Sequence, residues 1–81
     1  MSIPTYYITT PSSSGKITLW PMTAYGEICT SLPDAETKLA TLVALASKGT
    51  KLSLEMQKAV IKNGQVEKLD GLSSVVKTVT A

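Results

Sequence analysis

The chain has 81 residues and a net charge of +2, and it contains no histidine, no arginine and one cysteine, Cys29. Without an imidazole or a guanidinium group, it lacks the residues of Ser–His and Cys–His catalytic pairs, of His-ligated zinc sites and of bidentate phosphate recognition. We therefore expect a single domain, residues 1–81, without enzymatic activity, cofactor or metal. Because a lone cysteine excludes an internal disulfide, the stability of this domain should depend on packing or on a partner.

The N-terminal part, residues 1–32, is predicted to be mainly β-structure. β-Branched and aromatic residues dominate segments 5–10 and 16–20, which flank a turn-forming stretch at 11–15. This pattern predicts a β-hairpin. Residues 25–30 are a candidate third strand, so the N-terminal sheet has two or three strands in this prediction.

Two helices are predicted in the centre of the chain, residues 33–63. Ser31 is a suitable N-cap, and Pro33 fits the first turn of a helix that should end near Gly49. The second helix is expected over residues 51–62, before an Asn-Gly pair. A short turn would join the two helices.

The C-terminal part, residues 64–81, is ambiguous between strand and a third helix. Four apolar residues recur at helical spacing: Leu69, Leu72, Val76 and Val79. The Asp70-Gly71 pair is instead a hairpin-turn signal, and the β-branched run at 75–80 favours a strand. The fold class expected from these elements is α+β: an N-terminal hairpin, two central helices and a C-terminal strand or third helix.

The two predicted helices each have a second face that a partner could cover. In the first, Ala35, Leu39 and Leu42 mark the core face, whereas Ala40 and Ala44 lie on an uncharged side of small residues that allows a close approach. A weakly polar solvent-exposed face is the alternative interpretation. The first helix thus contributes Ala40 and Ala44 as candidate interface residues.

In the second predicted helix, Leu54 and Ile61 lie opposite the main apolar stripe, so they are candidate interface residues unless the tail packs over them. Tyr7 and Trp20 of the hairpin complete the candidate interface, with cross-strand core packing as the alternative. Cys29 is expected to be a buried structural cysteine, since no histidine is present to activate it.

The N-terminus shows no basic region followed by an apolar core, as a signal peptide would. The longest uncharged apolar stretch, residues 39–47, is too short to cross a bilayer. We therefore expect no membrane partner and an intracellular (cytoplasmic) or virion location.

The leading hypothesis is a non-enzymatic structural or assembly protein that contacts copies of itself or other subunits, for instance as a small bacteriophage virion component. One alternative is a small winged-helix-like nucleic-acid-binding regulator, in which the tail is a third helix and Lys51, Lys58 and Lys62 contact phosphates. Another is an adaptor or inhibitor that docks onto one host protein.

Overall fold

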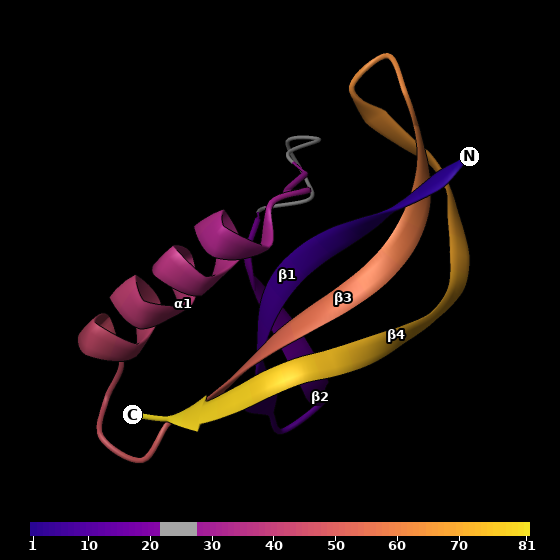
Figure 1. Ribbon diagram of the computed structural model, residues 1–81. Coiled ribbons are helices and arrows are strands. Elements are labelled where there is room, and N and C mark those ends of the chain that lie inside the picture. Colours follow the sequence, from indigo (N-terminus) through magenta and orange to yellow (C-terminus); the bar gives the residue numbers. More distant parts are fainter. Residues whose placement is uncertain (22–27) are drawn as a thin grey trace.

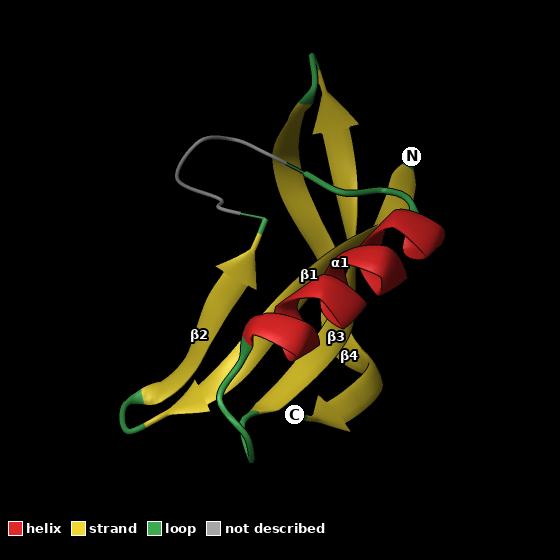
Figure 2. Cartoon of the chain, turned by 90° about the vertical axis from the view of Figure 1, so that its left-hand side faces the viewer, coloured by secondary structure: helices red, strands yellow, loops and turns green. Residues whose placement is uncertain are grey.

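The computed structural model describes residues 1–21 and 28–81, which form one antiparallel four-stranded sheet and one helix. The elements in chain order are β1 (Ser2–Ser12), β2 (Gly15–Trp20), α1 (Leu32–Leu45), β3 (Lys51–Lys62) and β4 (Gln65–Thr80). The strands are arranged in the order β2-β1-β3-β4. The helix lies across one face of the sheet, so the molecule has two layers (Figures 1 and 2).

The first two strands form the predicted N-terminal hairpin. They pair antiparallel from Ile8 opposite Trp20 to Ser12 opposite Gly15, with an irregularity after Ile8. The candidate third strand at 25–30 lies partly outside the described residues, and residues 28–30 are not in a strand. Cys29 instead accepts a hydrogen bond through its carbonyl from the Tyr6 N–H, at 2.9 Å.

The helix α1 begins where the sequence predicts. The Ser31 hydroxyl accepts a hydrogen bond from the Asp34 N–H at 3.4 Å, and Pro33 lies in the first turn. The helix ends at Leu45, before the expected stop at Gly49. The chain then turns back toward the sheet, and the Gly49 N–H donates to the carbonyl of Ala81 at 2.7 Å.

Replacing Ser31 by alanine is expected to lower the free energy of unfolding by about 1 kcal/mol, because one N–H of the first helical turn loses its acceptor. Chemical denaturation measures the change. Ser47→Ala, at an exposed position beyond the helix, is the matched control and should leave stability nearly unchanged. Equal effects of the two substitutions would contradict a capping role for Ser31.

The prediction of a second central helix is wrong, because residues 51–62 form the strand β3. Leu52 and Leu54 are buried two residues apart, which is the spacing of one face of a strand. β3 pairs with β1 on one side and β4 on the other. The region between the hairpin and the tail therefore contributes one helix and a central strand of the sheet.

The tail is a strand along almost its whole length, and it does not turn at Asp70-Gly71. The chain reverses at Asn63 and Gly64, which have positive φ angles of 54° and 75°. Lys62 and Gln65 pair across these two residues, as in a two-residue hairpin. Gly71, with φ of 83°, instead lies inside β4, where the pairing with β3 is irregular.

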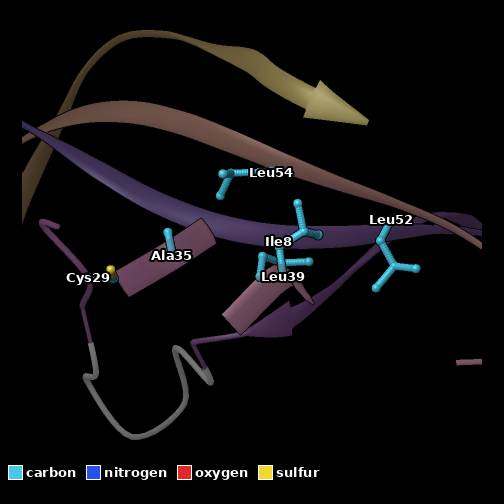
Figure 3. Packing of buried hydrophobic residues seen from close by; sticks show 6 residues of the cluster. All are labelled: Ile8, Cys29, Ala35, Leu39, Leu52 and Leu54. Carbon is cyan, nitrogen blue, oxygen red and sulfur yellow. The ribbon is translucent and has the colours of Figure 1, made fainter. Parts of the chain in front are cut away.

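The core lies between α1 and the two central strands (Figure 3). Its buried residues come from both layers and from the segment before the helix: Ile8, Cys29, Ala35, Leu39, Leu52 and Leu54. The predicted core face of the helix is confirmed, since Ala35 and Leu39 are buried and Leu42 packs partly against the cluster. Cys29 is buried there with a free thiol.

Candidate functional site

The structure separates the candidate interface residues of the sequence analysis. Leu54 is fully buried in the core under α1, where it has no surface to offer a partner. Ile61 is half-buried near the far end of β3. Trp20 packs partly against the core at the end of β2, and Tyr7 is half-buried in β1. These four side chains do not form one surface.

Ala40 and Ala44 are exposed on α1, which agrees both with a side that allows close approach and with a solvent-exposed face. They line a shallow hollow of about 340 Å³ between the helix and the end of β4. Lys77 of β4 closes part of this hollow and lies 3.8 Å from the Glu36 carboxylate across it. The side of α1 that carries Ala40 and Ala44 is therefore adjacent to the end of β4.

The most distinctive surface is the outer edge of β4, which lies at the end of the sheet. Five apolar side chains of this strand are exposed, with exposed fractions of 41% for Val66, 62% for Leu69, 95% for Leu72, 57% for Val75 and 42% for Val76. No strand in the described ranges, 1–21 and 28–81, pairs with this edge. A long edge strand with exposed apolar side chains is a template for pairing with another chain.

β4 is also longer than the strand it pairs with, by 16 residues to 12. The extra residues of β4 lie where its pairing with β3 is irregular, at Glu67, at residues 71–73 and at Val76. Extra residues on one strand bend it, and the ribbon of β4 curves strongly in Figure 1. The opposite edge of the sheet, β2, has only six residues.

The sequence does not show that β4 is an edge strand. Three of its exposed apolar residues, Leu69, Leu72 and Val76, also fit helical spacing, and nothing local indicates which strand ends a sheet. The usable signal was the β-branched run at 75–80, which favours a strand but does not give its neighbours.

A buried charged group lies on the sheet face opposite α1. Glu55 is only 2% exposed, and its carboxylate accepts hydrogen bonds from the Thr9 hydroxyl at 2.6 Å and from Lys16 Nζ at 3.0 and 3.2 Å. These donors come from β1 and β2, so the cluster ties three strands together. Its hydrogen bonds are internal, which fits a structural role.

A second hollow, of about 240 Å³, lies beside β1. Its described lining includes Thr5, Tyr7, Gln57, Val66 and Leu69, and no lysine or carboxylate among the described residues lines it. Across residues 1–21 and 28–81, no three acidic, histidine or cysteine side chains gather as a metal site would require.

The winged-helix arrangement required residues 51–62 to be a helix and the tail to be a third helix. Both segments are strands, so that expectation of the fold is wrong. Lys51, Lys58 and Lys62 are exposed on β3, and no recognition helix presents them.

No protein-family model matches this chain, and no curated protein or solved structure is significantly similar to it. Within the described residues, no helix is both long enough and apolar enough to cross a membrane.

Proposed function

We propose that this chain is a non-enzymatic structural or assembly protein whose contact surface is the outer edge of β4. The observation that carries the proposal is the exposure of five apolar side chains along one free edge strand. Backbone N–H and C=O groups at such an edge bind another strand, and the apolar side chains add contact area.

The chemistry of the chain supports a binding role over a catalytic one. The sequence has no histidine, and the carboxylate of Glu55 is engaged by Thr9 and Lys16. Of the nine large apolar side chains that are exposed among the described residues, five lie on one element, β4. A contact between copies of the chain is one requirement of a particle of many copies, such as a virion, and we extend the proposal to an intracellular or virion setting.

Leu72→Lys is expected to abolish association through β4 while leaving the monomer folded. The Leu72 side chain is 95% exposed, so a lysine there loses no internal packing, whereas a charge on an edge strand disfavours pairing with another strand. The measurement is the absolute mass by light scattering after size exclusion, over a wide range of concentration. The unsubstituted chain should give a stable oligomer and the variant a monomer.

The matched control is Leu45→Lys, because Leu45 is 79% exposed but belongs to α1 and not to β4. This variant should keep the mass of the unsubstituted chain. A monodisperse monomer for the unsubstituted chain at all concentrations would contradict self-assembly. Stoichiometric binding of one different protein to β4 would favour the adaptor function instead.

A further inference from the structure

We infer that the occupant of the β4 edge is a second copy of this chain, bound antiparallel about a two-fold axis that passes through Leu72. The inference rests on the proposed function and adds to it the partner and the register. It follows from three independent properties of β4: the direction of its free peptide groups, the placement of its charges and the positions of its irregularities.

The backbone of β3 shows which residues of β4 turn their peptide groups toward the free edge. The carbonyl of Gln57 points to β1, where it accepts from the Thr5 hydroxyl at 2.6 Å. The carbonyl of Thr50 points the other way and accepts from the Ala81 N–H at 2.8 Å. Odd-numbered residues of β3 therefore bond to β1, and even-numbered residues bond to β4.

Residues of β4 opposite odd-numbered residues of β3 consequently present their own N–H and C=O groups at the free edge. These residues are Val66, Leu69, Val75, Thr78 and Thr80. A second strand binds well only in a register that brings its own free groups opposite these positions.

A two-fold axis at Leu72 satisfies this condition. In that register Leu69 lies opposite Val75 of the partner subunit, and Val66 lies opposite Thr78 of the partner subunit. Symmetry repeats each pair, so four of the five free positions face another free position. The Leu72 side chain, 95% exposed in the single chain, then lies against its own copy.

The charges of β4 are complementary in the same register. Glu67 lies opposite Lys77 of the partner subunit, and the two-fold axis repeats this pair. Opposite charges that face each other across paired strands stabilise the pairing. The strand carries two acids and two lysines, Glu67, Asp70, Lys68 and Lys77, so two copies do not repel through net charge. A shift of the partner by one residue in one direction puts Lys68 opposite Lys77 of the partner subunit, so two like charges face each other. A shift by one residue in the other direction removes both Glu67–Lys77 ion pairs.

The irregularities of β4 also match. Those at Glu67 and Val76 lie on either side of the central one at 71–73, nearly symmetric about Leu72. A two-fold axis there brings bent segments opposite bent segments. A register that pairs Asp70 with Lys77 of the partner subunit keeps two ion pairs, but it brings only two of the five free positions, Leu69 and Thr78, opposite another free position.

Cysteine cross-linking of the full chain tests the axis directly. With Leu72→Cys, the two new thiols face each other across a strand pair whose Cα separation suits a disulfide, so mild oxidation should convert most of the protein to a covalent dimer. Leu69→Cys is the matched control, because its copy lies about 20 Å away along the pair. Combining Leu69→Cys with Val75→Cys should restore cross-linking. The unsubstituted chain, whose Cys29 is buried, gives the background.

A charge exchange tests the register without a covalent bond. Glu67→Lys should raise the dimer Kd by about tenfold, since two attractive pairs become repulsive, and adding Lys77→Glu should recover the original Kd. An oligomer that is not cross-linked through Leu72→Cys and is indifferent to the charge exchange would overturn the register while leaving the assembly function standing. A monomer at every concentration would overturn both.

Discussion

Leu54→Ala is expected to lower the free energy of unfolding by about 2–5 kcal/mol. Leu54 of β3 is fully buried under α1, in the cluster that also contains Ile8 and Leu39, so truncation leaves a cavity that the neighbours fill only in part. A domain of this length has a total stability of roughly 4–12 kcal/mol, so the loss is a large share of it. Chemical denaturation followed by circular dichroism measures the change.

Leu72→Ala is the control for this result, because it makes the same chemical change at a side chain that is 95% exposed. At concentrations low enough to keep the chain monomeric, it should change stability by no more than about 0.5 kcal/mol. The difference in stability between the two variants distinguishes a leucine of the core from one at the exposed edge. If Leu54→Ala left stability unchanged but reduced association, Leu54 would belong to an interface and the packing of α1 on β3 would be incorrect.

Lys16→Met is expected to destabilise the fold by about 1–3 kcal/mol, because it leaves the 2%-exposed carboxylate of Glu55 with the Thr9 hydroxyl as its remaining described donor. The lower part of that range applies if water reaches the carboxylate, since the Lys16 side chain is itself 59% exposed. Lys58→Met removes an exposed lysine of β3 and should cost little.

Glu55→Gln should cost less than Lys16→Met. The amide oxygen still accepts from Thr9, and the exposed Lys16 ammonium returns to water. The double variant should then be less destabilised than the sum of the two single changes, because the charge that Lys16 compensates has been removed. Additive effects measured by denaturation would show that the two groups are not coupled.

Local signals in the sequence were sufficient for the first hairpin and for the start of α1. The stretch at 11–15 carries turn-forming residues between β-branched runs, and Ser31 followed by Pro33 is a helix start whatever lies around it. Both features act over a few residues. They therefore give the same result in the isolated sequence and in the folded protein.

The error at β3 has a definite cause. Segment 51–62 is rich in Leu, Lys, Glu, Met and Gln, which favour helices in isolation. In the protein these residues pair with β1, and Thr9 bonds to Glu55 across 46 positions of sequence. In a helix, Leu54 would lie opposite the main apolar stripe. In a strand, residues two apart share a face, so Leu54 is buried on the same face as Leu52.

The absence of histidine and arginine, the hairpin, the capped helix and the apolar content of the tail can all be read from the sequence. The central place of β3, the burial of Leu54 in the core and the position of the apolar residues of β4 on a free edge follow instead from the fold. Helix caps and turns depend on neighbours along the chain, whereas strand order and exposure depend on contacts between distant segments. The surface proposed for assembly is a property of that second kind, because a strand becomes an edge only when the other strands have taken their places.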